Sequence, residues 1–321
     1  MTDQSVAVVI PCFKTKDSIL NVISGIPTDV KLIYVVDDCC PEKTGDYVKD
    51  SCKDRRVRVL THSKNKGVGG AVISGYQQAL ADRATIIVKV DGDGQMNPAL
   101  IPKFVKPIIS GKADYVKGNR FFNQELMTGM PGIRKIGNAI LSFIIKASSG
   151  YWNMMDPTNG YTAIHAAALK MLPLHQIDNG YYFESDMLFR LNTIRAVVYD
   201  LPMRAKYGHE VSHLRIGRIL WEFPGKCTGR FLKRIVYNYF LHDFNIGSFQ
   251  LLMALFLITA GSLFGLIHWF SGLTSNALAS SGTVMLAALP IILGFQSLLS
   301  VMNYDVSNIP QHPIHLKQEE L

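Results

Sequence analysis

Residues 85–95 have the sequence TIIVKVDGDGQ, an apolar run that ends in two aspartates separated by one glycine. β-Branched residues favour strands, whereas aspartate and glycine favour turns. Three earlier runs share this composition and also end at polar or glycine-bearing residues, at 6–10, 31–36 and 57–60. We therefore predict four strands, with Asp91 and Asp93 directly after the fourth.

Amphipathic stretches with helical spacing separate these strands, at 18–24, 43–51 and 69–80. This alternation predicts an α/β fold, with a Rossmann-like, mostly parallel sheet covered by helices on both faces. Ligands of such sheets bind beyond the carboxyl ends of the strands. The segments expected at that edge are 11–15, 37–40, 65–70 and 91–95. Downstream, we predict strands at 114–118 and 195–201 and helices at 133–147 and 184–193.

Two long segments, 246–270 and 283–304, contain no Asp, Glu, Lys or Arg. A membrane-spanning helix needs about 20 apolar residues. A buried hairpin in a soluble core is the alternative, but two uncharged stretches of this length favour a transmembrane hairpin. The preceding segment, 214–240, mixes bulky apolar and basic residues, which is typical of interfacial helices.

Basic residues predict the orientation of this hairpin. None lies in the loop 271–282, whereas six precede the first span: Arg215, Arg218, Lys226, Arg230, Lys233 and Arg234. The positive-inside rule then places the N-terminal domain in the cytoplasm, and residues 1–6 lack the basic start of a signal peptide. We predict a multi-pass protein of the inner (cytoplasmic) membrane. Its parts are an α/β domain at 1–210, juxtamembrane amphipathic helices at 211–245, two transmembrane helices at 246–304 and a cytoplasmic tail at 305–321.

The net charge of the 321-residue chain is +8. Basic proteins often bind nucleic acid, but no nucleic-acid motif accompanies the charge here. A juxtamembrane cluster facing anionic lipid headgroups is the simpler interpretation. The five cysteines include the adjacent pair Cys39 and Cys40, which fits neither a disulfide framework nor a zinc site. We expect reduced thiols and no nucleic-acid partner.

Asp91 and Asp93 are the strongest candidates for chemistry. Hard cations such as Mg²⁺ or Mn²⁺ prefer oxygen ligands and usually keep substrate phosphates in their coordination sphere. An acidic turn that solvates a strand end is the alternative for a lone D-x-D. The position after the fourth strand favours a metal that bridges a diphosphate.

Two further segments are expected at the same edge. After the second strand, Asp37 or Asp38 could accept hydrogen bonds from a base or a ribose, or could cap the following turn. The sequence NKGVGGA at 65–71 places glycines ahead of a helix, where backbone N–H groups can approach a phosphate. A plain turn explains these glycines equally well, because no P-loop or G-x-G-x-x-G pattern is present.

Taken in order, these motifs resemble the family-2 glycosyltransferases of the GT-A fold, over residues 6–207. Val9-Ile10-Pro11, Asp37-Asp38, the glycine turn and Asp91-x-Asp93 carry the resemblance. The polyprenyl-phosphate branch, with its dolichol-phosphate mannose synthases and bacterial undecaprenyl-phosphate glycosyltransferases, is the most similar. The resemblance implies metal binding by Asp91, Asp93 and Gln95. It also implies a nucleotide-sugar donor held by Pro11, Phe13, Asp37, Asp38, Lys66, Gly67 and Asp91.

The same branch implies a set of cations for the acceptor phosphate. Gly118-Asn119-Arg120 looks like its G-x-R motif, and Arg134, Arg204 and Lys206 fall near its other phosphate-handling positions. A C-terminal hairpin is also usual in bacterial members. The chain departs from the branch at 12–15, where Cys-Phe-Lys-Thr replaces a Y-N-E pattern. Phe13 can still stack on a base, but the choice between UDP- and GDP-linked donors stays open.

The acceptor defines two alternative reactions. A lipid phosphate is already anionic near neutral pH, so transfer to polyprenyl phosphate needs docking cations such as Arg120 but no general base. Transfer to a sugar hydroxyl of a lipid-linked glycan would need a base, for which Glu184 and Asp186 are the candidates. We favour the phosphate acceptor, with inversion implied by the resemblance. A non-catalytic membrane scaffold would not require the D-x-D, and a homo-oligomer is compatible with the sequence.

Overall fold

The structure is a computed structural model that describes residues 4–121, 132–203, 216–276 and 278–319. Contacts divide the chain into two compact units. The first comprises Met1–Phe231 together with Pro310–Leu321, and the second comprises Leu232–Ile309. The C-terminal segment therefore belongs to the same unit as the N-terminal domain, although the second unit separates them in sequence.

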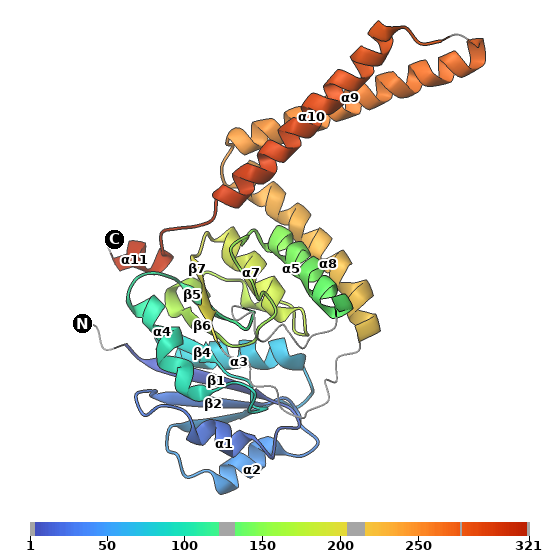
Figure 1. Cartoon of the computed structure of the whole chain (residues 1–321). Helices are drawn as coiled ribbons and strands as arrows, with labels where there is room; N and C mark the ends of the chain where they lie inside the picture. The colour runs from blue at the N-terminus through green and yellow to red at the C-terminus, as the bar shows by residue number, and fades with distance from the viewer. Residues whose placement is uncertain (1–3, 122–131, 204–215, 277, 320–321) are drawn as a thin grey trace. The chain divides into compact units, whose positions relative to one another are not determined.

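The first unit contains a seven-stranded sheet with the order β3-β2-β1-β4-β6-β5-β7 (Figure 1). Its strands are β1 (Val6–Cys12), β2 (Leu32–Asp37), β3 (Val57–Thr61), β4 (Ile86–Lys89), β5 (Tyr115–Asn119), β6 (Thr162–His165) and β7 (Val198–Pro202). β6 is antiparallel to both of its neighbours, and the other pairs are parallel. The predicted α/β fold is confirmed. β6 is the strand that the sequence did not predict.

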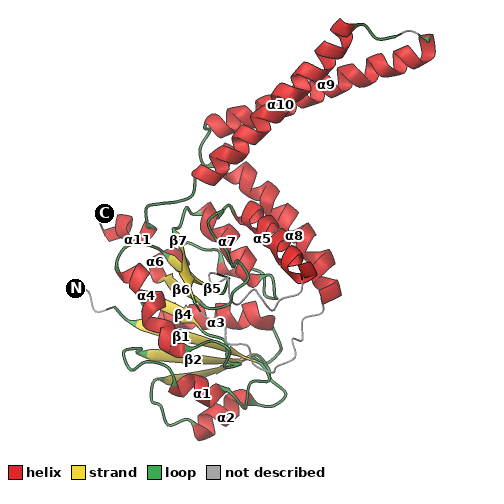
Figure 2. Ribbon diagram, in the orientation of Figure 1, coloured by secondary structure: helices red, strands yellow, loops and turns green. Residues whose placement is uncertain are grey.

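Helices cover both faces of this sheet (Figure 2). They are α1 (Ile19–Ser24), α2 (Thr44–Ser51), α3 (Gly67–Ala81), α4 (Ile101–Ile109), α5 (Gly132–Ser149), α6 (Ala166–Lys170) and α7 (Phe183–Thr193), with short 3-10 turns at Pro98–Leu100 and Leu174–Gln176. Successive side chains of a strand point to opposite faces. Val8 packs with α1 and α4 in the main core, whereas Val9 lies against Gly75 of α3. Both valines are fully buried, which explains the continuous apolar run.

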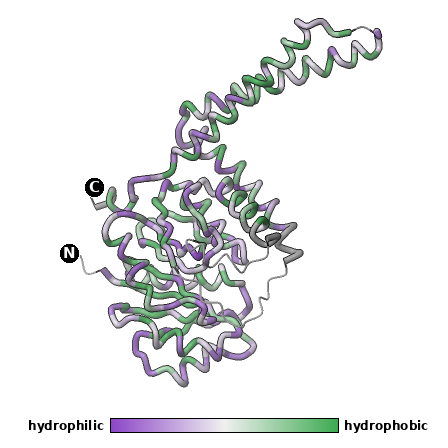
Figure 3. Tube along the Cα trace, in the orientation of Figure 1, coloured by the Kyte–Doolittle hydropathy of each residue, from purple (hydrophilic) through white to green (hydrophobic). Residues whose placement is uncertain are grey.

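The second unit is built around α9 (Ile246–Ser275) and α10 (Ser281–Ser307), which lie side by side (Figure 3). Both helices are long and apolar enough to cross a membrane, with a mean hydropathy of 2.1 over their most apolar windows. Only 11% of each window is buried, so these are not core helices of the described protein. Glycines bring the backbones together: a Cβ at Gly261 would lie 2.7 Å from the Ala287 carbonyl oxygen.

The helix α8 (Ile216–Val236) and the π-helical turn Tyr237–Leu241 precede this pair. Within the second unit, the guanidinium of Arg234 forms two hydrogen bonds with Asp305 at 2.6 and 2.9 Å, and Tyr239 donates a third at 2.9 Å. Arg234 is only 1% exposed. The expectation that the basic cluster faces lipid headgroups is wrong for this residue, because its charge is compensated inside the protein.

Two other members of the basic cluster are also ion-paired, within the first unit. Lys226 Nζ lies 2.6 Å from Asp178, and Arg230 Nε lies 2.6 Å from Asp186. These contacts attach α8 to the loop before α7 and to α7 itself. The sequence showed the charges but not their acidic partners, which lie more than forty residues earlier.

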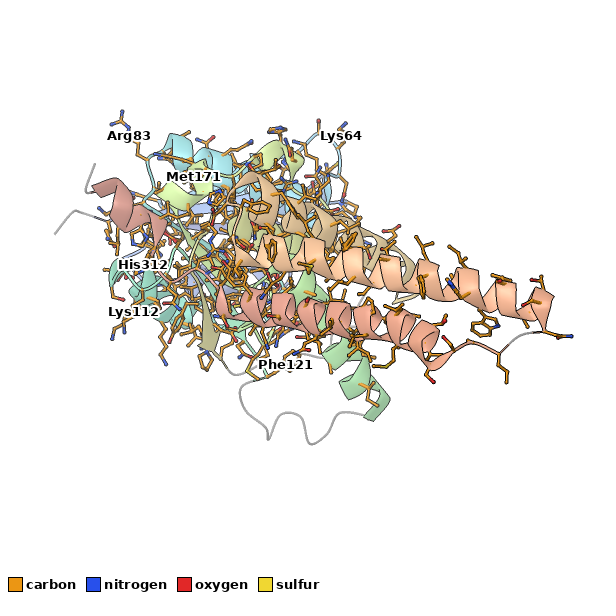
Figure 4. The ribbon with its side chains drawn as sticks, turned by 90° about the horizontal axis from the view of Figure 1, so that it is seen from above. Lys64, Arg83, Lys112, Phe121, Met171 and His312 are labelled. Carbon is orange, nitrogen blue, oxygen red and sulfur yellow. The ribbon has the colours of Figure 1, made fainter. Side chains whose placement is uncertain are left out.

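The C-terminal helix α11 (Ile314–Glu319) packs on the first unit at the start of β5. Buried Asp114 accepts hydrogen bonds from the backbone N–H groups of Ile314 and His315 and from the His315 ring, at 3.0, 3.1 and 2.8 Å. The His315 ring also stacks on His165, with 4.4 Å between centroids. Burial, together with His315, lowers the pKa of His165 to about 4. Figure 4 labels His312, which leads into α11, and Lys112, in the turn beside it.

Candidate active site

The candidate site lies where β1, β2 and β4 end. Cys12 pairs with Asp37 and Val9 with Lys89, so the carboxyl ends of these parallel strands meet at one edge of the sheet. Gly92, in the turn after β4, lies against the segment after β1: a Cβ there would be 3.1 Å from the Cys12 sulfur. Ser18 also donates a 2.7 Å hydrogen bond to the Gly92 carbonyl. The predicted convergence of these segments is confirmed.

Asp91 and Asp93 follow β4 at this edge, and both are partly exposed. One oxygen of Asp91 lies 2.8 Å from Lys89 Nζ, and Asp93 Oδ1 accepts a 2.9 Å hydrogen bond from the Gln95 N–H. The Gln95 side chain is exposed. Among the described residues, no cluster of three or more His, Cys, Asp or Glu side chains could hold a metal by itself. Two neighbouring carboxylates are the kind of ligand that Mg²⁺ and Mn²⁺ accept in proteins.

Glu184 and Asp186 occupy the first turn of α7 but have different surroundings. Glu184 is 13% exposed, and its Oε1 lies 3.2 Å from Lys89 Nζ, which places it near Asp91. Asp186 is fully buried between Arg190 and Arg230, at 3.2 and 2.6 Å. The expectation that Asp186 could serve as a general base is wrong in this structure, because its carboxylate is enclosed by two guanidinium groups.

Asp37 and Asp38 are both buried and both bind backbone N–H groups. Asp37 accepts from Cys40 and Gly45 at 2.7 and 2.6 Å, so it organises the turn that leads into α2. Asp38 accepts from Lys66 and Gly67 at 2.8 and 2.7 Å. Asp37 therefore caps the turn that follows it, as one of the pair was expected to do, whereas Asp38 binds the backbone at the distant start of α3.

The glycines of the first turn of α3 contact protein backbone where the sequence allowed a phosphate. Gly69 and Gly70 donate to the Asn179 carbonyl at 2.9 and 3.2 Å. A Cβ at Gly67 would lie 2.5 Å from that same oxygen, and Gly67 has a positive φ of 83°. Of the two alternatives left open for these glycines, the structure favours the turn without a phosphate, since the Gly67 N–H is bonded to Asp38 and the Gly69 N–H to Asn179. These glycines let the loop before α7 approach α3, whereas the Lys66 side chain is exposed.

Pro11 and Phe13 lie at the end of β1. Pro11 is buried within the strand, and Phe13 follows it with 45% of its surface exposed. Lys14 adopts a left-handed conformation with φ of 57°, which turns the chain directly after the ring. Phe13 thus presents an accessible aromatic face at the same edge as Asp91, as stacking on a base would require.

Arg120 follows β5 and forms a bidentate pair with Asp156, with Nε and Nη2 at 2.7 and 3.0 Å from its oxygens. Asp156 is fully buried, and the Arg120 side chain is 34% exposed. The guanidinium is therefore held in a fixed orientation at the surface. Arg134 lies in α5, but its side chain is outside the described part of the structure, as are Arg204 and Lys206.

Several buried charges near the site were missed by sequence reasoning. Lys89 and Lys117 sit inside apolar strands and are 1% and 0% exposed. Burial lowers the pKa of Lys117 to about 8, and it raises that of Asp200 to about 6. Asp156 lies in the irregular connection between α5 and β6. A lone charge within an apolar strand is the signal that could have identified both lysines, since a buried charge needs partners.

Comparison with known proteins adds three findings on sequence. The sequence model of the family described as "Glycosyl transferase family 2" matches residues 7–172. A UDP-N-acetylglucosamine–dolichyl-phosphate N-acetylglucosaminyltransferase of Methanococcus voltae is 30% identical over 221 residues, which cover 64% of this chain and 88% of that protein. An undecaprenyl-phosphate mannosyltransferase of Micrococcus luteus is 31% identical over 173 residues, which cover 53% of this chain and 70% of that protein.

Among solved structures, glucosyl-3-phosphoglycerate synthase from Mycobacterium tuberculosis is similar in fold. Its complex with Mn²⁺, uridine diphosphate and glucosyl-3-phosphoglycerate has a TM-score of 0.52 and 19% identity, covering 72% of this chain and 80% of that one. At this identity the likeness concerns the fold alone.

Proposed function

Because the chain belongs to glycosyl transferase family 2, we propose that it transfers a sugar from a nucleotide-sugar donor to polyprenyl phosphate. Two of the relatives are named for transfer to dolichyl or undecaprenyl phosphate. The observation that carries the proposal is the pairing of both candidate bases. Asp186 is enclosed by Arg190 and Arg230, and Glu184 is paired with Lys89. A phosphate acceptor is already ionised and needs no base.

Asp91 and Asp93, assisted by Gln95, would hold a divalent cation beside the donor diphosphate. Such an ion offsets the charge that develops on the leaving group when it is bound. Phe13 would stack on the nucleobase, and the exposed Lys66 would approach the phosphates. Asp37 and Asp38 contribute to donor binding chiefly by fixing the turns around it, since both bind backbone N–H groups.

The acceptor phosphate would dock on Arg120, Arg134, Arg204 and Lys206. Arg120 supports this role because Asp156 fixes its guanidinium plane while a third of the side chain remains exposed. A planar guanidinium in a fixed orientation suits the recognition of phosphate oxygens. With the phosphate held there, its oxygen could attack the sugar from the side opposite the leaving diphosphate, with inversion.

We also propose that α9 and α10 form a transmembrane hairpin with the catalytic domain on the cytoplasmic side. The two helices have the length and hydropathy of membrane spans. The contact of His315 with Asp114 supports an even number of membrane crossings. The chain after α10 returns to the same unit that contains the N-terminal α/β domain. The cytoplasmic side is where the positive-inside rule places the basic segments that precede the hairpin.

Sugar transfer to a lipid acceptor provides the test of this function. The full-length protein in detergent would be incubated with labelled UDP- and GDP-sugars, Mn²⁺ and polyprenyl phosphate. We expect one donor to give a lipid product whose sugar is released by mild acid. Asp93→Asn, or EDTA, should abolish transfer while the protein keeps its melting temperature. Full activity of Asp93→Asn in EDTA would refute the metal assignment. Transfer only to a lipid-linked glycan would establish a hydroxyl acceptor.

A further inference from the structure

Lys89 is the residue at which three parts of the site meet. Its ammonium lies 2.8 Å from Asp91, 3.2 Å from Glu184 and 3.0 Å from the Gly160 carbonyl. These partners come from the turn after β4, from α7 and from the segment before β6. The contacts with Glu184 and Gly160 are hydrogen bonds, and the contact with Asp91 is an ion pair.

Lys89 is charged in this position although it is almost fully buried. Burial favours the neutral amine, but two carboxylates within 3.2 Å of the ammonium favour the charged form. The neighbouring backbone is shaped to permit the contact. A Cβ at Gly160 would lie 2.6 Å from Lys89 Nζ and 2.7 Å from Asp91 Oδ2, so only glycine leaves room for both groups.

This contact affects the metal-binding carboxylate. Asp91 Oδ1 is buried and forms an ion pair with the Lys89 ammonium at 2.8 Å. This contact reduces the availability of the oxygen to a metal ion. A divalent cation that binds Asp91 also lies close to the positive charge of Lys89, and repulsion between such charges is strong where water is excluded. A donor diphosphate adds negative charge and further oxygen ligands, and both compensate for this penalty.

We propose that Lys89 makes metal binding at Asp91 and Asp93 depend on the donor diphosphate. Lys89 is a positioning residue: it holds one oxygen of Asp91 and repels a divalent cation that arrives alone. The metal then enters together with the nucleotide, and the empty site does not retain it. This inference rests on the metal-dependent function proposed above, but it concerns the order and coupling of binding.

Direct binding of Mn²⁺ to the full-length protein tests the proposal. Free Mn²⁺ would be measured by electron paramagnetic resonance, with and without UDP. We expect the wild-type protein to bind Mn²⁺ much more tightly when UDP is present. In Lys89→Met, Mn²⁺ alone should bind about tenfold more tightly or better, because the nearby positive charge is gone. In the same variant, the increase in Mn²⁺ affinity that UDP causes should be smaller than in the wild-type protein by a similar factor.

Lys117→Met is the matched control. Lys117 is also a buried lysine in a strand of the same sheet, but its ammonium donates to the Asn159 carbonyl. Its removal should leave Mn²⁺ binding within about threefold of wild type, since its ammonium is bonded to a backbone carbonyl and not to a metal-binding carboxylate. Lys89→Gln, which keeps a polar group but not the charge, serves as a second variant if Lys89→Met does not fold.

Each outcome bears on the proposal differently. If a folded Lys89 variant binds Mn²⁺ alone no more tightly than wild type, the role of Lys89 is refuted and the proposed sugar transfer is unaffected. Equal Mn²⁺ affinity of the wild-type protein with and without UDP refutes it too, without any variant. No Mn²⁺ binding under either condition would refute the metal assignment and the role of Lys89 together.

Discussion

Glu184 and Asp186 differ by two positions in α7, and this small difference determines what each carboxylate can do. In an α-helix, two positions correspond to more than half a turn, so their side chains point to different sides. Glu184 points to Lys89 and the D-x-D turn, whereas Asp186 points into the arginines of α7 and α8. Sequence reasoning treated them as equivalent candidates because the partners that distinguish them, Lys89 and Arg230, lie far away in the chain.

These surroundings predict that mutation of Asp186 lowers the stability of the protein much more than mutation of Glu184. Asp186→Ala should leave two arginines without their buried counter-charge and destabilise the protein by about 3–5 kcal/mol. Glu184→Gln keeps the shape of a partly exposed side chain and should change the melting temperature little. If the acceptor is a phosphate, Glu184→Gln should keep transfer within about tenfold, whereas loss of a true general base costs about 10²–10⁴-fold. Thermal melts and transfer rates of the two variants decide between these results.

At the scale of elements, long apolar runs were predictable and contacts between distant segments were not. β1, β2 and β4 are buried on both faces, so their sequences alone show continuous apolar character. β6 is four residues long and is held by antiparallel pairing with β4 and β5, which leaves little local signal. The sequence showed the glycines at the start of α3. Their hydrogen-bond partner, the Asn179 carbonyl, could not be inferred from the local sequence.

The glycine turn leads to a prediction about α3 and α7. A Cβ at Gly69 would lie 2.4 Å from the Asp178 carbonyl oxygen, a backbone atom that cannot move aside easily. Gly69→Ala should therefore destabilise the protein by about 1–3 kcal/mol, the usual cost of overpacking. Gly137→Ala in α5 is the control, since its Cβ would have no atom of the described residues within 4 Å. Chemical denaturation measures both, and equal stabilities would contradict the assigned role of Gly69.

At the scale of the whole molecule, the chain leaves the first unit once and returns to it once. It leaves through α8 and returns at Pro310, where α11 packs against residues near the start of β5. Buried Asp114 accepts three hydrogen bonds from this returning segment, so the attachment is specific. The sequence predicted a tail on the same side as the domain from charge alone, and nothing in it indicated that His315 would be buried.

Together with the proposed transmembrane hairpin, this path of the chain predicts which residues are accessible from each side of the membrane. Ser275 is the last residue of α9, next to the loop that leads to α10. His312 is exposed and precedes α11. In cells with an intact inner membrane, a charged maleimide should label Ser275→Cys from outside. It should reach His312→Cys, and the exposed native Cys39, only after permeabilisation. Because α11 and the domain with Cys39 form one unit, His312→Cys and Cys39 must report the same side. Labelling of His312→Cys from outside, with Cys39 protected, would mean an odd number of crossings and would contradict both the hairpin and the docked tail.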